Sequence, residues 1–138
     1  PMEALPANGS CICGAVRFSI APPYRGFQYC HCSRCRKVTG SAHAANVFVP
    51  VAQFSWTAGE EHTRRHEVAT AQYFCTGFCA VCGSTLPWVT RNGRTMVVPA
   101  GSLDDDPGVR PTQSVYMASG APWYVSCDAL PQHDDKPT

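Results

Sequence analysis

The sequence predicts a single, mainly β domain of short antiparallel strands with few, short helices. Twelve prolines and eleven glycines are spread over the 138 residues, and no stretch beyond about ten residues keeps a 3.6-residue apolar period. Short runs rich in β-branched and aromatic residues lie between Gly, Pro, Asn or Ser residues, as strands do. These runs are Ala15–Ile20, Phe27–Cys30, Ala44–Val49, Phe54–Thr57, Thr63–Val68, Gln72–Thr76, Thr85–Thr90, Thr95–Ala100 and Ser114–Met117.

Three local patterns make this prediction specific. Apolar and polar residues alternate over Val16–Ile20, which predicts a strand with one buried face. Asn92-Gly93 lies between two apolar runs and predicts a hairpin that joins residues 86–90 to 95–98. Ser33–Lys37 is expected to form a single helical turn with Ser33 as its cap.

A chain of this length suits one domain with one core. We expect the folded domain to span residues 9–131. Residues 1–8 are expected to be disordered or an added leader, because Pro1 precedes Met2, and residues 132–138 are expected to form a frayed polar tail.

Charge and hydropathy argue against some classes of partner. The formal net charge is +1 and charged residues make up 15% of the chain, so no strong field favours nucleic acid or an anionic membrane. No apolar run approaches the ~18 to 20 residues of a membrane helix, and the N-terminus has no basic, apolar leader pattern. A cytoplasmic protein is expected.

The nine cysteines are spaced like metal ligands rather than like a disulfide framework. Their number is odd, no signal peptide is apparent, and seven of them fall into tight groups. The groups are Cys11 with Cys13, Cys30 with Cys32 and Cys35, and Cys79 with Cys82.

Two of these groups have the form of zinc knuckles. Zinc bound by four thiolates is tetrahedral, with Zn–S bonds of about 2.3 Å, so neighbouring sulfurs must approach to roughly 3.8 Å. The short turns Cys11–Cys13 and Cys79–Cys82 can bring two sulfurs that close. One pair cannot complete a metal shell, whereas two pairs can; the alternative is that these cysteines pack as small buried hydrophobes.

The third group, Cys30-His31-Cys32-Ser33-Arg34-Cys35, offers three sulfurs to one metal. In an extended segment Cys30 and Cys32 point to the same side, and the spacer can fold Cys35 back towards them. Three protein ligands with a vacant fourth position are typical of a catalytic or ligand-binding zinc. The alternative is that His31, Cys75 or Cys127 closes the shell, although His31 should point to the opposite face and the two cysteines more often pack in a core.

Five blocks of the sequence, in order, resemble the glutathione-dependent formaldehyde-activating (GFA) family, which also includes centromere-protein-V-like proteins. The blocks cover most of the chain between Gly9 and Trp123. They are Gly9–Val16, Cys30–Lys37 with Thr39–Ser41, Phe78–Ser84, Ala100–Asp104, and Ala121–Trp123.

The resemblance implies two zinc ions per chain. Cys11, Cys13, Cys79 and Cys82 would hold a structural zinc, and Cys30, Cys32 and Cys35 a catalytic one. It also implies a β-tent fold and a carbon–sulfur lyase that adds glutathione to formaldehyde, so that a thiol and an aldehyde are the expected partners. The alternative function is a non-catalytic zinc scaffold or protein-interaction module.

Residues beside the three-cysteine group Cys30, Cys32 and Cys35, here called the triad, are further candidates for ligand contacts or catalysis. Arg34, Arg36 and Lys37 can offset its charge or contact the carboxylates of glutathione, and the alternative is that they are a solvated turn. His31 is a candidate general acid, or else a structural residue. Trp123 is the tryptophan expected to line a ligand cleft.

Overall fold

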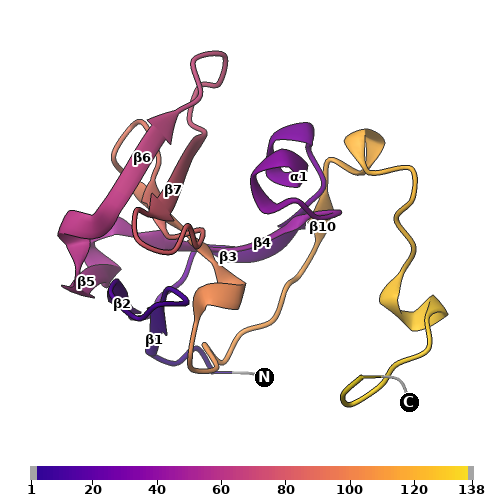
Figure 1. The fold of residues 1–138 in the computed structure, drawn as a ribbon, viewed down its shortest axis with the longest axis horizontal. Helices are drawn as coiled ribbons and strands as arrows, with labels where there is room; N and C mark the ends of the chain where they lie inside the picture. Colours follow the sequence, from indigo (N-terminus) through magenta and orange to yellow (C-terminus); the bar gives the residue numbers. More distant parts are fainter. Residues whose placement is uncertain (1–2, 137–138) are drawn as a thin grey trace.

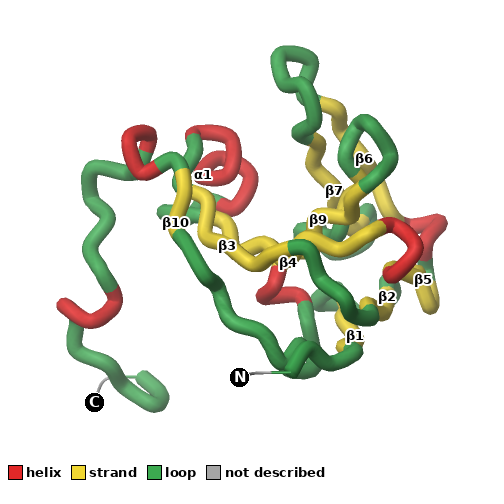
Figure 2. Tube along the Cα trace, turned by 180° about the vertical axis from the view of Figure 1, so that it is seen from behind, coloured by secondary structure: helices red, strands yellow, loops and turns green. Residues whose placement is uncertain are grey.

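The computed structural model describes residues 3–136, which form ten short strands and one α-helix (Figures 1 and 2). The helix α1 spans Ser33–Thr39. The strands are β1 (Ala7–Ser10), β2 (Arg17–Ile20), β3 (Gly26–Cys30), β4 (Ala44–Pro50), β5 (Phe54–Ala58), β6 (Thr63–Glu67), β7 (Cys75–Cys79), β8 (Trp88–Val89), β9 (Thr95–Pro99) and β10 (Ser114–Val115). Single turns of 3-10 helix lie at Val51–Gln53, Glu60–His62, Ala100–Ser102, Met117–Ser119 and Cys127–Ala129.

The strands form three sheets, in the orders β1-β2-β5, β10-β3-β4-β9-β8 and β6-β7. Every pairing of adjacent strands is antiparallel except that of β10 with β3, which is parallel. The prediction of a mainly β domain with short antiparallel strands and few helices is therefore confirmed.

The predicted hairpin is confirmed, with Val89 opposite Met96 and the Thr90 N–H donating to the Thr95 carbonyl over 2.8 Å. Two other strands differ from the prediction. β7 begins at Cys75 rather than near Gln72, because the residues before it form the turn of the β6–β7 hairpin, in which the Ala71 N–H donates to the Val68 carbonyl over 3.0 Å. β1 was not predicted at all, since its sequence Ala-Asn-Gly-Ser has little β propensity.

The main core lies between the first two sheets. Phe18 and Ile20 of β2 pack against Val47 and Val49 of β4 and against Val98 of β9. The alternation predicted for β2 is present, since Phe18 and Ile20 are buried and Arg17 is exposed. Only one face of the five-stranded sheet joins this core, and its other face is left for the candidate site.

The N-terminal strand is held by the turn that follows β9. The Ser10 hydroxyl donates to a carboxylate oxygen of Asp104 over 2.8 Å, and the Asn8 N–H donates to Asp105 over 2.9 Å. The Leu5 N–H also donates to the Pro107 carbonyl over 2.8 Å. These contacts include residues that precede residue 9, and the expected domain span of 9–131 stays a prediction.

The expected disorder falls partly on residues 1–2 and 137–138, which lie outside the described residues. Residues 132–136 are exposed and contain no helix or strand. After β10 the chain passes α1 on the side away from the β6–β7 hairpin, as both views show (Figures 1 and 2). Within residues 3–136, no helix has both the length and the apolar composition needed to cross a membrane.

Substitution of two glycines with the same backbone φ angle tests how the β5–β6 connection packs. Gly59 and Gly93 both have φ of +74°, but a Cβ at Gly59 would lie 1.8 Å from the Ala15 carbonyl oxygen, whereas one at Gly93 would meet no atom within 4 Å. Gly93→Ala should cost about 1 to 2 kcal/mol of unfolding free energy from the left-handed backbone alone. Gly59→Ala should cost at least about 2 kcal/mol more, because the loop must move away from Ala15. Equilibrium urea denaturation measures both costs, and equal midpoints would contradict the close packing of Gly59 against Ala15.

Candidate metal centres

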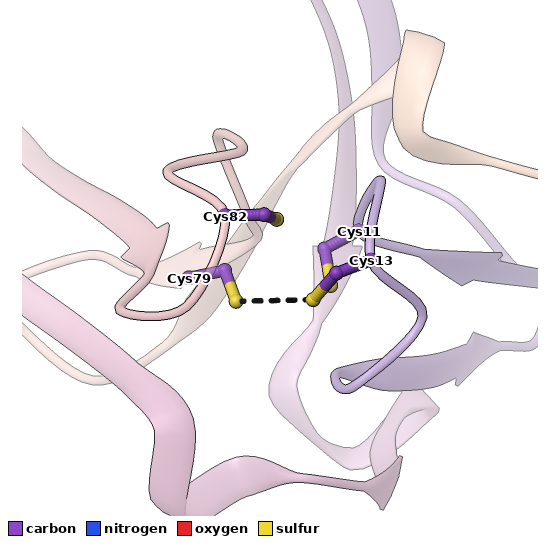
Figure 3. A group of neighbouring side chains, drawn as sticks. All are labelled: Cys11, Cys13, Cys79 and Cys82. Atoms are coloured by element: carbon purple, nitrogen blue, oxygen red, sulfur yellow. Dashed lines mark hydrogen bonds between the residues drawn. The ribbon is translucent and has the colours of Figure 1, made fainter.

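Four cysteine sulfurs from two distant turns meet at one point (Figure 3). Cys11 and Cys13 lie in the turn between β1 and β2, whereas Cys79 ends β7 and Cys82 lies in the turn after it. The Sγ atoms of Cys11 and Cys13 are 3.5 Å apart, and those of Cys13 and Cys79 are 4.0 Å apart. All four sulfurs lie within 4.8 Å of one another, and the two spacings given above bracket the roughly 3.8 Å edge of a tetrahedral zinc–thiolate shell.

Backbone hydrogen bonds shape both turns. The Gly14 N–H donates to the Cys11 carbonyl over 3.0 Å, and the Gly83 N–H donates to the Cys79 carbonyl over 2.8 Å. Two further N–H groups point at sulfur, that of Val16 at Cys11 and that of Val81 at Cys79, each over 3.4 Å. Such donors stabilise the thiolates that a metal ion requires.

The electrostatics favour ionised sulfur at two of these positions. The hydroxyl and the N–H of Ser84 lower the pKa of Cys82 to about 5. Burial acts to raise the pKa of Cys11, but hydrogen bonds from the Val16 N–H and the Cys13 thiol outweigh it, and the net shift is downward. At Cys13 the Ala15 N–H acts to lower the pKa, but the hydrogen bond with the Cys11 thiol and burial raise it to about 11. The donor set and its spacing therefore fit a closed metal site, and a metal ion would displace the proton of Cys13.

The second group, Cys30, Cys32 and Cys35, also brings its sulfurs within 4.8 Å of one another. Cys30 is the last residue of β3, and Cys35 lies in the first turn of α1. The helix cap differs from the prediction. Cys32, and not Ser33, is the N-cap, because its Sγ accepts the Cys35 N–H over 3.3 Å.

The three thiols of this group titrate differently. Burial raises the pKa of Cys30 and Cys35. Burial acts in the same direction on Cys32, but hydrogen bonds from the Cys35 N–H and from the two neighbouring thiols lower its pKa overall. Cys32 is thus the member that ionises first, and a metal ion would displace the protons of the other two.

None of the three candidate fourth ligands joins this group in the described part of the chain. Cys75 is fully buried on β7, with its Sγ 2.9 Å from a guanidinium nitrogen of Arg65. Cys127 is exposed in a C-terminal turn. The protein therefore offers three sulfurs at this point and no fourth cysteine or histidine ligand from residues 3–136.

His31 lies on the opposite face of the segment from its cysteine neighbours, as predicted. Its ring is fully buried between the rings of His43 and Tyr124, each with its centroid 4.9 Å away. Burial, and then the charge of His43, lowers the pKa of His31. The structure therefore does not place His31 beside the three sulfurs, where a general acid would have to lie.

A cavity of about 210 Å³ opens beside the three-cysteine group. It continues into an outer cavity of about 590 Å³, because the two share several lining residues. The shared residues are Arg34, Phe48, Phe74, Trp88, Val97 and Tyr116. We call the two cavities together the cleft.

The three basic residues beside the triad do not share one location. Arg34 lines the cleft, where one guanidinium nitrogen donates to the Thr70 carbonyl over 3.2 Å. Arg36 and Lys37 instead line a separate cavity of about 250 Å³ with Trp123. Trp88, rather than the expected Trp123, is therefore the tryptophan of the cleft.

Sequence reasoning missed most of the cleft wall. Gln28 and Asn46 are paired on neighbouring strands and line its inner part. Phe74 was assigned to a strand, but it lies in the loop before β7 and faces the cleft. The available signal was the parity of β3 and β4, which places Gln28, Asn46 and Phe48 on the same face of the sheet as Cys30.

Comparison with known proteins identifies the family of the chain. A sequence model of the family described as glutathione-dependent formaldehyde-activating enzyme matches residues 6–119. A protein of Halomonas elongata, named as a candidate enzyme of that kind, is 32% identical over 130 residues, which cover 91% of this chain and 83% of the relative.

A solved structure supports the fold independently. The crystal structure of a Rhodobacter sphaeroides protein superposes with a TM-score of 0.60 at 22% identity, covering 78% of this chain and 99% of the other. At that identity the likeness shows the fold alone. The family match, which spans most of the chain and both cysteine groups, carries the assignment: this chain belongs to the glutathione-dependent formaldehyde-activating family.

Proposed function

We propose that this chain is a zinc-dependent carbon–sulfur lyase that forms or cleaves S-(hydroxymethyl)glutathione or a related thiol–aldehyde adduct. The observation that carries the proposal is a three-sulfur group that lies at the inner end of a cleft and has no fourth cysteine or histidine ligand from the described chain. Thiolate sulfurs at these spacings suit zinc among the common metal ions. The family to which the chain belongs is named for formaldehyde and glutathione.

The two cysteine groups have different roles in this proposal. Cys11, Cys13, Cys79 and Cys82 hold a structural ion that joins the first sheet to the β6–β7 hairpin. Cys30, Cys32 and Cys35 hold the second ion. Zinc bound by three cysteine sulfurs would supply a Lewis-acidic position at which a substrate thiol loses its proton near neutral pH.

The reaction itself needs few groups from the protein. A carbon–sulfur bond forms between the thiol sulfur and the aldehyde carbon, and the thiol proton ends on the aldehyde oxygen. Asn46 and Gln28 line the cleft beside the triad, so their side-chain amides can donate to that oxygen. The Gln28 Oε1 already accepts from Gln113 over 2.9 Å, which leaves its NH₂ group to serve as the donor.

Metal content and stability test the structural site. The purified protein should contain about two zinc ions per chain. Cys79→Ser should remove one of them and lower the free energy of unfolding by more than about 4 kcal/mol, because metal binding is coupled to folding. Elemental analysis and chemical denaturation measure both effects. Cys127→Ser, which alters an exposed cysteine outside both groups, is the matched control and should retain both ions.

Thiol binding tests the open site. Cys32→Ser should leave the fold intact, since a serine hydroxyl still caps α1 and the triad packs in a small cluster apart from the main core. The same change should weaken zinc binding at this site by at least about 100-fold and abolish heat of binding for glutathione in calorimetry. If the variant binds glutathione as the wild type does, the open site is assigned to the wrong residues. If the zinc-loaded wild type binds no thiol, the scaffold alternative is favoured over the enzyme.

A further inference from the structure

The face of the five-stranded sheet that lines the cleft changes character in steps. Cross-strand neighbours on this face form rows. The row next to Cys30 is the polar pair of Gln28 on β3 and Asn46 on β4. The next row is the apolar series of Phe48, Val97 and Trp88, which are direct neighbours across β4, β9 and β8. Successive rows on one face are about 7 Å apart. A ligand with its sulfur at the triad therefore meets polar groups first and an apolar wall next.

A third aromatic residue, Phe74, packs against the apolar row. Phe74 lies with its ring centroid 5.2 Å from that of Trp88, at an interplanar angle of 48°. Tyr116 also lines both parts of the cleft. Phe74 and Trp88 are half-buried, and both face a cavity. Their exposed ring surfaces can therefore contact a ring or a branched aliphatic group of a ligand.

The cleft contains few charged side chains. Besides the cysteines, Arg34 is the one charged side chain among the described residues that line it, and no carboxylate lines it. One guanidinium nitrogen contacts Thr70, which leaves other N–H donors for a ligand carboxylate. The cleft thus matches a single negative group on the ligand.

Glutathione fits this lining poorly. It carries two carboxylates, an ammonium group and two amides, and each needs a polar partner when it leaves water. The inner cavity of about 210 Å³, next to the sulfur, offers one guanidinium and the two amides of Gln28 and Asn46, and the rest of its wall beyond the triad is mainly aromatic and aliphatic. Further polar side chains line only the outer cavity; these are Gln72, Thr90, Asn92 and Thr95.

From these features we propose that the cleft selects a thiol with an apolar, aromatic-sized body and a single carboxylate, in preference to a peptide thiol. The sulfur of this thiol lies at the triad, its carboxylate contacts Arg34, and its ring packs against the exposed surfaces of Phe74 and Trp88, whose own rings are in contact. The inference rests on the proposed function, because it assigns a substrate class to the same site.

The experiment compares the affinities of four thiols for the zinc-loaded protein by calorimetry. They are 2-mercapto-3-phenylpropanoate, 2-mercaptopropanoate, which lacks the ring, 2-phenylethanethiol, which lacks the carboxylate, and glutathione. The first should bind at least about tenfold more tightly than each of the others, since a well-packed ring and a charge-assisted hydrogen bond each contribute on that scale.

Two variants separate the contributions. Trp88→Ala should weaken binding of the phenyl acid about tenfold and change that of 2-mercaptopropanoate less than about twofold. Arg34→Met should weaken the phenyl acid about tenfold and leave 2-phenylethanethiol unchanged. Arg36→Met and Trp123→Ala are the matched controls, because both residues line the other cavity, and neither should alter any affinity. Circular dichroism and zinc content establish that each variant is folded and loaded.

The outcomes distinguish this inference from the function on which it rests. Thiols that bind the Cys32→Ser variant as well as they bind the wild type would overturn the site itself. Thiols that require Cys32, with glutathione the tightest or with Trp88→Ala weakening the ring-free acid equally, would overturn the preference for an aromatic acid and leave the site in place.

Discussion

The approach of four sulfurs from two turns more than sixty residues apart is the contact on which the rest of the architecture depends. The cluster around them is small, with Val16 and Leu86 as the buried aliphatic residues beside Cys11 and Cys79. A metal ion that closes so long a loop removes much of the unfolded chain's freedom. The short strands of this fold bury little by themselves, so an ion held by these four sulfurs would add to the main core that already packs β2 against β4 and β9.

The second cysteine group lies outside the main hydrophobic core. Cys30 and Cys35 pack with Ala44 in a satellite cluster, apart from the main core of Phe18, Ile20 and their partners. A site with a free position must admit ligand and water, which conflicts with the packing that stabilises a core. Under the proposed function, separation of the two cysteine groups resolves that conflict, because the four-sulfur group would support the sheets while the three-sulfur group lies at the cleft.

Much of the fold could be predicted because periodicity and ligand spacing are local signals. Alternation in Val16–Ile20, the Asn92-Gly93 turn and the cysteine spacings all appear within a few residues. β1 could not be predicted in this way. Its Gly9 lies opposite Phe18, and a Cβ there would approach the Phe18 ring to 2.2 Å, so a poor strand former is required by a tertiary contact that local propensity does not contain.

The cleft could not be predicted from the sequence for a related reason. A two-residue period separates the faces of a strand but does not say whether the face away from the core meets water or a second layer. On β4, Val47 and Val49 face the core, while Asn46 and Phe48 form a mixed polar and apolar face that suits neither a core nor bulk water. Phe74 covers that face from a loop assigned to a strand by its composition. Such a mixed face can be interpreted only when both walls are known, and its combination of a few polar groups with aromatic and aliphatic ones is typical of small-molecule pockets.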